Sequence, residues 1–177
     1  MSKLIVNALL FQIGWFACVA GDGAWLALVG GILLVHLLWV SRWAAEGKLL
    51  VSVFLVGSAL DSFLLNLGVF DFGEPRRLIP LWLALLWLLL ATTLNHSLAW
   101  SARPWWRASL LGAVSAPLSY YAGARLAGVG LPLGTWQTLL LLAAIWAVVL
   151  PALHGFAELY RQQYRQRQAA LAARPDA

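Results

Sequence analysis

The chain has 177 residues, of which 62% are apolar and only 11% are charged. Soluble domains carry about 45–50% apolar and about 25% charged residues, so this composition excludes an ordinary soluble domain and a disordered chain. The single cysteine, Cys18, excludes a disulfide scaffold. The net charge of +5 does not indicate nucleic-acid binding, because the basic residues lie in predicted loops and in the C-terminal tail.

Six apolar segments follow one another along the chain, separated by short stretches rich in glycine, proline and charge. They are Leu4–Ala20, Ala24–Val40, Leu49–Phe70, Leu78–Trp100, Trp106–Leu126 and Trp136–Phe156. In lipid each spanning segment must be helical, because no water is present to satisfy the backbone. These runs are continuous rather than alternating, which argues against a β-barrel. We therefore predict an all-α transmembrane bundle of six helices over residues 1–157 and a basic tail over residues 158–177.

The distribution of lysine and arginine predicts the orientation of this bundle. Nine of the twelve basic residues lie on the side of the N-terminus, and three lie on the other side. The positive-inside rule then places both termini in the cytoplasm. The tail is expected to meet anionic headgroups there. The predicted location is a bacterial inner membrane, crossed several times.

Asp61 lies near the middle of the third segment and is the only acid placed that deep. A charge at the bilayer centre costs about 2.5–3.5 kcal/mol on the insertion scale. Asp61 is therefore either a functional carboxylate, which carries a proton or binds a cation or substrate, or a protonated group that hydrogen-bonds to a neighbouring helix. Gln12 and Ser115 lie at similar depth in their own segments and are possible partners.

The three histidines all lie toward the predicted cytoplasmic ends of their segments. They are His36, His96 and His154. Three imidazoles can bind zinc, but no two of them have ligand spacing within one helix, and Glu158 is the nearest acid in sequence. We predict no metal and no cofactor, and leave open either interfacial histidines or a polar site.

Further polar residues share this end of the bundle. Thr92, Asn95 and His96 are spaced i, i+3, i+4 and so share one helix face, which we expect to point into the bundle. Asn7 is predicted at the same depth in the first segment. Asn7, Asn95 and His96 are therefore candidates for a polar intramembrane site.

The fifth segment carries a line of small residues at intervals of four. It consists of Ser115, Ser119, Gly123 and Ala127, with a parallel line of Gly112, Ala116, Tyr120 and Ala124. Small residues let another helix approach closely, so the first line is predicted to pack against a neighbour. Tyr120 and Arg125 are placed toward the outer surface. Arg125 either binds the phosphate or carboxylate of a headgroup or snorkels to the interface.

Several of these segments resemble a known family. They are the stretch Asn7–Phe16, Asp61-Ser62, Pro80-Leu81-Trp82, Ala91–Leu98 and Pro117–Gly123. Together they resemble a family of small bacterial inner-membrane proteins classed only as a domain of unknown function, over about residues 1–156. The resemblance implies an inner-membrane location and a link to fatty-acyl modification, such as cyclopropane-synthase-like enzymes. It implies no catalytic residues.

Three functions remain open. The first is a non-catalytic accessory or lipid-binding protein, since the loops are too short for a soluble catalytic domain and no nucleotide loop or nucleophile elbow is present. The second is a small transporter or flippase with Asp61 as its coupling carboxylate. The third is an intramembrane lipid-modifying enzyme. The expected partners are membrane lipids, with a lipid-modifying enzyme or a second copy of the chain, and no nucleic acid.

Overall fold

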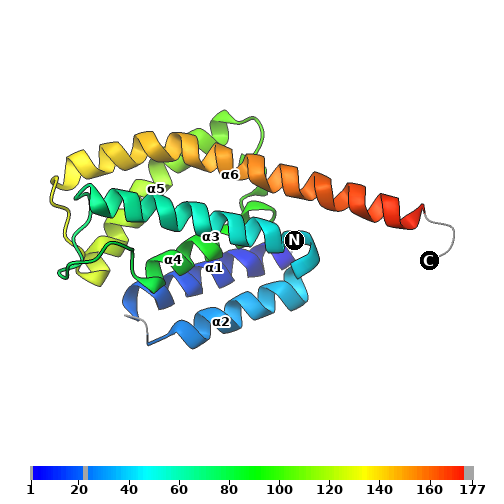
Figure 1. Ribbon diagram of the computed structural model, residues 1–177, viewed down its shortest axis with the longest axis horizontal. Coiled ribbons are helices and arrows are strands. Elements are labelled where there is room, and N and C mark those ends of the chain that lie inside the picture. The colour runs from blue at the N-terminus through cyan, green and yellow to red at the C-terminus, as the bar shows by residue number, and fades with distance from the viewer. Residues whose placement is uncertain (1, 22–23, 174–177) are drawn as a thin grey trace.

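The computed structural model describes residues 2–21 and 24–173, and the fold over these residues is all-α. Six α-helices follow in order, as Figure 1 shows: α1 (Ser2–Ala20), α2 (Leu26–Val35), α3 (Trp43–Asn66), α4 (Leu81–Leu94), α5 (Trp106–Ala127) and α6 (Thr135–Ala172). A π-helical turn, η1 (His36–Val40), continues α2, and a short 3₁₀ turn, η2 (Ala99–Ser101), precedes α5. The six predicted helices are confirmed.

Three of the helices, α1, α3 and α6, are long and apolar enough to cross a membrane. The stretch Leu26–Val40 and α4 are shorter apolar helices. Large apolar side chains lie on the outside of the bundle, for example Leu38 and Trp136, each 76% exposed. Such a surface suits contact with lipid rather than with water. The helices thus form a bundle with three candidate membrane spans.

The helices pack in two groups that meet at α3 and α4. The most extensive contact joins α5 and α6, while α1 packs against α2 and α4, and α3 packs against α4 and α6. In Figure 1 the start of α1 and the projecting half of α6 lie at the same end of the bundle. The larger apolar core includes Leu49, Val53, Leu142 and Leu153, whose side chains are almost completely buried.

Two glycines allow the closest approaches between helices. A Cβ on Gly57 of α3 would lie 1.9 Å from the Trp87 ring of α4. A Cβ on Gly112 of α5 would lie 2.3 Å from the Trp146 carbonyl oxygen of α6. Both distances are far below van der Waals contact, so the packing of these two helix pairs depends on the absence of a side chain.

Several helix boundaries differ from those predicted. The third helix begins at Trp43 rather than Leu49, so Glu46 lies in its first turn instead of in a loop. Ala44, Ala45 and Glu46 are good helix formers, and a negative charge near a helix N-terminus is favourable. The fourth helix ends at Leu94, and its C-terminal hydroxyls on Thr92 and Thr93 donate back to the carbonyls of Leu89 and Leu90.

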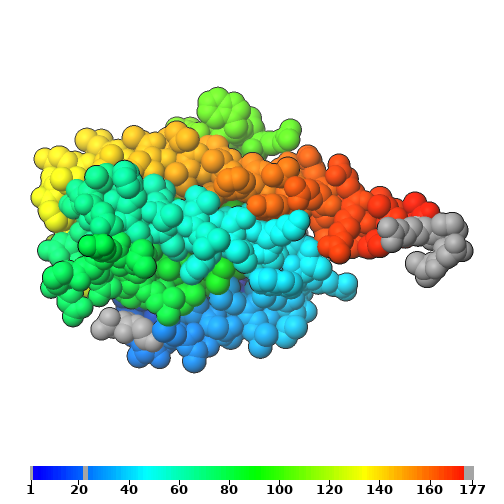
Figure 2. All heavy atoms as spheres, in the orientation of Figure 1, coloured from blue at the N-terminus to red at the C-terminus, as the bar shows by residue number. Residues whose placement is uncertain are grey.

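The last helix is much longer than a single span. α6 has 38 residues and contains Pro151. At 1.5 Å per residue it is about 57 Å long, whereas a span needs roughly 20 residues. Figures 1 and 2 show its C-terminal half projecting beyond the other helices. The first part of the predicted tail therefore continues this helix.

Candidate functional site

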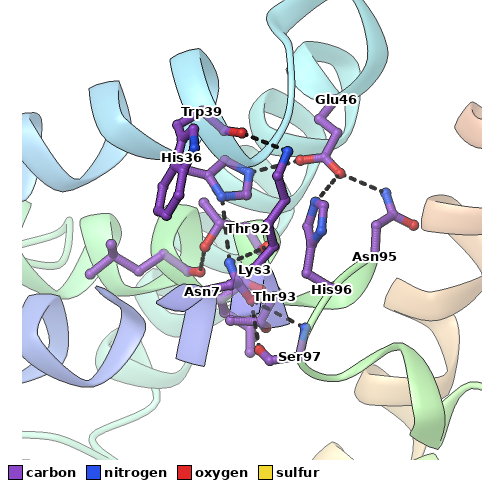
Figure 3. Close-up of polar contacts among 12 residues, drawn as sticks. Lys3, Asn7, His36, Trp39, Glu46, Thr92, Thr93, Asn95, His96 and Ser97 are labelled. Atoms are coloured by element: carbon purple, nitrogen blue, oxygen red, sulfur yellow. Dashed lines mark hydrogen bonds and ion pairs between the residues drawn. The ribbon is translucent and has the colours of Figure 1, made fainter. Parts of the chain in front are cut away.

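A cluster of two histidines and a glutamate is buried near the end of the bundle from which α6 projects. His36 begins η1, Glu46 lies in the first turn of α3, and His96 lies in the turn after α4. The two Nε2 atoms face the same carboxylate: His36 Nε2 lies 2.8 Å from Glu46 Oε2, and His96 Nε2 lies 2.8 Å from Glu46 Oε1 (Figure 3). One carboxylate thus links three segments that are far apart in the sequence.

Two asparagines surround this cluster. Asn95 Nδ2 donates to Glu46 Oε1 at 3.3 Å. Asn7 Oδ1 accepts from the backbone N–H and the hydroxyl of Ser97, at 3.2 and 2.7 Å. Its Nδ2 donates to the Thr92 carbonyl at 3.0 Å and lies 3.4 Å from His36 Nδ1. The structure thus brings the sequence candidates Asn7, Asn95 and His96 together, and it adds His36 and Glu46.

The cluster is buried and contains one acid. The side chains of His36 and Glu46 are 1% and 5% exposed, and that of His96 is 18% exposed. Among the described residues, Glu46 forms ion pairs only with the two histidines. The side-chain ligand atoms of His36, Glu46 and His96 all lie within 4.8 Å of one another, so this group could hold a metal ion.

Asp61 forms a second buried polar cluster, deeper in the bundle. Its side chain is fully buried and accepts two hydrogen bonds of 2.7 Å, from Trp87 Nε1 on α4 and from the Tyr120 hydroxyl on α5. The partners considered from depth alone lie elsewhere: Gln12 is exposed, and the Ser115 hydroxyl donates to the Leu111 carbonyl. Asp61 therefore connects α3, α4 and α5.

An apolar cavity of about 310 Å³ lies beside Asp61. Trp87 and Tyr120, which bind Asp61, form part of its wall. Most of the remaining wall is aromatic and aliphatic and comes from α1, α4, α5 and α6; it includes Phe11, Trp15, Trp82, Leu86, Leu90, Leu111, Trp146 and Leu150. Ligand pockets commonly measure about 300–1,000 Å³ and are mainly apolar. The size and lining of this cavity suit an apolar ligand.

Both lines of small residues on α5 reach the cavity, which Ala116, Tyr120 and Ala124 of the second line also border. Ser115, Ser119 and Gly123 line the cavity, and Ser119 accepts a 3.0 Å hydrogen bond from Trp15 Nε1. A Cβ on Gly123 would lie 3.9 Å from its nearest neighbours, which leaves room for a larger side chain. Gly112, the first residue of the second line, instead packs closely against α6.

The remaining predicted residues lie outside both clusters. Arg125 is exposed in the last turn of α5, and Ala127, the last residue of that helix, is half-buried. His154 is buried on α6, where its Nε2 lies 2.9 Å from the Ser101 hydroxyl. His154 also lines a polar groove of about 570 Å³, together with Asn95, Arg103 and Arg161.

The sequence prediction missed Glu46 because it placed the charged stretch before Leu49 in a loop. Extending the helical pattern backward through Ala44 and Ala45 would have placed Glu46 on α3 and made it a candidate partner for a histidine. His36 was noted from its depth, but its pairing with Glu46 and His96 depends on the tertiary fold.

Comparison with known proteins agrees with the resemblance seen in the sequence. Residues 4–152 match the family described as Protein of unknown function (DUF2878). The comparisons with curated proteins and with solved structures found no match. The matched region includes all five residues of the cluster formed by Asn7, His36, Glu46, Asn95 and His96, as well as Asp61 and the cavity. This chain therefore belongs to the DUF2878 family.

Proposed function

We propose that this protein is a non-catalytic accessory protein of a bacterial inner membrane that binds a lipid acyl chain in its apolar cavity. In this proposal all six helices cross the membrane and both termini are cytoplasmic. The single observation that carries the proposal is the cavity of about 310 Å³ with its almost entirely apolar wall. A saturated or methylated acyl chain has no polar atoms to satisfy, so it fits such a wall.

The shape of the cavity supports an elongated ligand. Its lining residues on α5 run from Leu111 to Ala124, and those on α4 include Trp82 and Leu90. Thirteen residues of helix correspond to about 20 Å along the helix axis. The hydrocarbon core of a bilayer is about 30 Å thick, so one leaflet contributes about half of that thickness. An acyl chain from one leaflet is therefore comparable in length to the lining of the cavity along α5.

The proposed partners follow from this ligand. A protein that holds an acyl chain can present this chain to a lipid-modifying enzyme in the same membrane. The other proposed partner is a second copy of the chain, which would form a homo-oligomer with it. The polar side-chain groups among the described lining residues are the hydroxyls of Ser115, Ser119 and Tyr120 and the indole N–H groups of the tryptophans, and none of these lining residues is charged. We therefore expect the chain, not the headgroup, to be the part of the lipid that is bound in the cavity.

A variant that fills the cavity tests this proposal. Gly123→Leu places a side chain into the open space beside Trp15 and should reduce lipid that copurifies in mild detergent. Gly30→Leu on α2 is the matched control, because nothing lies within 4 Å of a Cβ there and the residue is exposed. Mass spectrometry of extracted lipid should show a loss for Gly123→Leu alone. Equal lipid in both variants would contradict the proposal.

A second candidate is a transporter that uses Asp61. The observation that favours it is the position of this carboxylate: it is fully buried, and both residues that bind it also line the cavity. Intramembrane carboxylates commonly carry protons in transporters. Substitutions at Asp61 distinguish this candidate from the lipid-binding protein.

A further inference from the structure

The cluster of His36, Glu46 and His96 has the composition and convergence of a metal centre. The two imidazoles and the carboxylate come from three different segments, each Nε2 faces one of the two Glu46 oxygens (Figure 3), and one ligand atom from each residue lies within 4.8 Å of the other two. We propose that these three residues bind a divalent transition metal ion of the zinc and iron class. The site is separate from the apolar cavity and does not depend on the proposed lipid function.

The ligand set selects the class of metal. Imidazole suits zinc, iron, copper and nickel, whereas magnesium and calcium prefer oxygen ligands alone. Two histidines and one carboxylate provide three protein ligands and leave a position open for water or a substrate, as in many catalytic zinc and iron sites. No thiolate belongs to this group of described residues, since Cys18 lies in the separate core around α1 and α2.

The distances require only a small adjustment. Each Nε2 atom lies 2.8 Å from a Glu46 oxygen. Zinc–ligand bonds of about 2.0–2.2 Å in a tetrahedral site place ligand atoms roughly 3.3 Å apart. To share one ion, the two contacts to Glu46 need to open by about half an ångström, and the two imidazoles, whose ligand nitrogens lie within 4.8 Å of each other, need to turn toward the same point.

Local backbone structure aims the ligands at one another. His36 is the first residue of the π-helical turn η1, and π-turns frequently occur at functional sites because they redirect a side chain. Glu46 is held by the first turn of α3. Since two of the three ligands belong to helical elements and are nearly fully buried, their positions are largely fixed before an ion binds.

Charge balance also favours a cation. A buried carboxylate is costly unless a positive charge compensates it. Among the described residues the only ion-pair partners of Glu46 are His36 and His96, which carry a positive charge only when protonated, and the nearby Lys3 Nζ instead donates to the Trp39 carbonyl at 3.0 Å. A divalent ion bound between the carboxylate and two neutral imidazoles supplies this positive charge without a protonated histidine.

The hydrogen bonds of Asn7 determine which ring nitrogen of His36 carries the proton, and this proton must move when a metal ion binds. Because Asn7 Oδ1 accepts from Ser97, its Nδ2 faces His36 Nδ1, and the proton of His36 lies on Nε2. An ion on Nε2 moves that proton to Nδ1, where it faces a donor, so the Asn7 amide must turn. Asn7→Asp provides a carboxylate that accepts a hydrogen bond from His36 Nδ1–H. Loss of such an acceptor for a metal-binding histidine typically lowers metal affinity about 10- to 100-fold, so gaining one should raise it.

The polar groove beside α6 comes nearest to the site at Asn95. His96 is the most exposed ligand, and Asn95, which donates to Glu46, also lines that groove. Among the three ligands, His96 is therefore the one through which solvent comes closest to the site.

Metal content of the full chain tests the proposal. The protein is purified in detergent with an affinity tag that contains no histidine, stripped with EDTA, and dialysed against Zn²⁺, anaerobic Fe²⁺ or Mg²⁺. We expect a single Zn²⁺ or Fe²⁺ per chain by elemental mass spectrometry, a higher melting temperature with that ion, and no retention of Mg²⁺.

Four variants decide between a metal site and a hydrogen-bonded cluster. Glu46→Gln and His96→Gln should lose the ion; His96→Gln keeps a donor for Glu46 at a part-exposed position and so preserves the fold. His154→Ala, which alters a buried histidine outside the cluster, should retain it, and Asn7→Asp should bind it more tightly. Absence of Zn²⁺ and Fe²⁺ from the parent protein, or equal metal in His96→Gln and His154→Ala, would overturn the proposal.

Discussion

Asp61 shows how one buried carboxylate can be structural, functional or both. It accepts hydrogen bonds from Trp87 and Tyr120 and has no contact with solvent. An amide at this position can still accept from the indole and can donate to the tyrosine oxygen, whereas an alkyl group leaves both donors without an acceptor. An unsatisfied buried donor costs about 1–3 kcal/mol. The effect of a substitution at Asp61 should therefore depend on its hydrogen-bonding capacity.

We predict that Asp61→Asn melts close to the parent protein in detergent, and that Asp61→Leu melts at a clearly lower temperature. Adding Tyr120→Phe to Asp61→Leu should cost less than the sum of the two single changes, because the donor is removed together with its acceptor. Strictly additive effects would show that this hydrogen bond contributes no coupling.

The same variants separate the two proposed functions in a complementation assay. A lipid-binding protein should keep its activity in Asp61→Asn, because the wall of the cavity is preserved. A proton-coupled transporter should fold as Asp61→Asn but lose activity, since an amide cannot titrate.

The contact between α5 and α6 is the element-scale feature that depends most on a single residue. Gly112→Ala places a Cβ 2.3 Å from the Trp146 carbonyl oxygen, so the two helices must separate. Overpacking of this kind typically costs about 1–3 kcal/mol. We predict that Gly112→Ala lowers the melting temperature. Gly155→Ala on α6 should leave it unchanged, because nothing lies within 4 Å of a Cβ there. Similar melting of both variants would argue against this close approach.

Hydropathy predicted the six helices because each apolar run must be helical in lipid, but it placed their ends less well. Hydropathy places the charged stretch around Glu46 outside the apolar segment, although a glutamate is favourable in the first turn of a helix. At the other end of the chain the helix continues through Arg161 and Arg165, since hydrophilic side chains do not end a helix.

Asp61 could be singled out from the sequence because depth alone marks an acid in an apolar segment. The cluster around Glu46 could not, because its three ligands belong to segments separated by ten and by fifty residues. Their meeting depends on how α3 packs against α4 and on the π-turn at His36, and neither feature has a simple signature in the sequence.

The orientation of the whole molecule is the prediction with the broadest consequences. Reporter fusions after Ala177 and between Ser41 and Trp43 should report the cytoplasm, and a fusion at Pro75 should report the periplasm. The reason is the excess of lysine and arginine on the side of the N-terminus. The six-span bundle with a cytoplasmic N-terminus requires a cytoplasmic C-terminus. A reporter fused to the C-terminus that reports the periplasm would therefore contradict it.

The proline in α6 gives the whole molecule a mechanical property. Pro151 lies between Leu150 and Leu153, which are buried in the bundle, and about 30 Å of continuous helix follows it. A proline removes one backbone hydrogen bond and is the usual point at which a helix bends. A bend of about 10° there moves the far end of α6 by about 5 Å. Pro151 is half-buried, so a change in packing that bends the helix at this residue would move its C-terminal end by several ångströms.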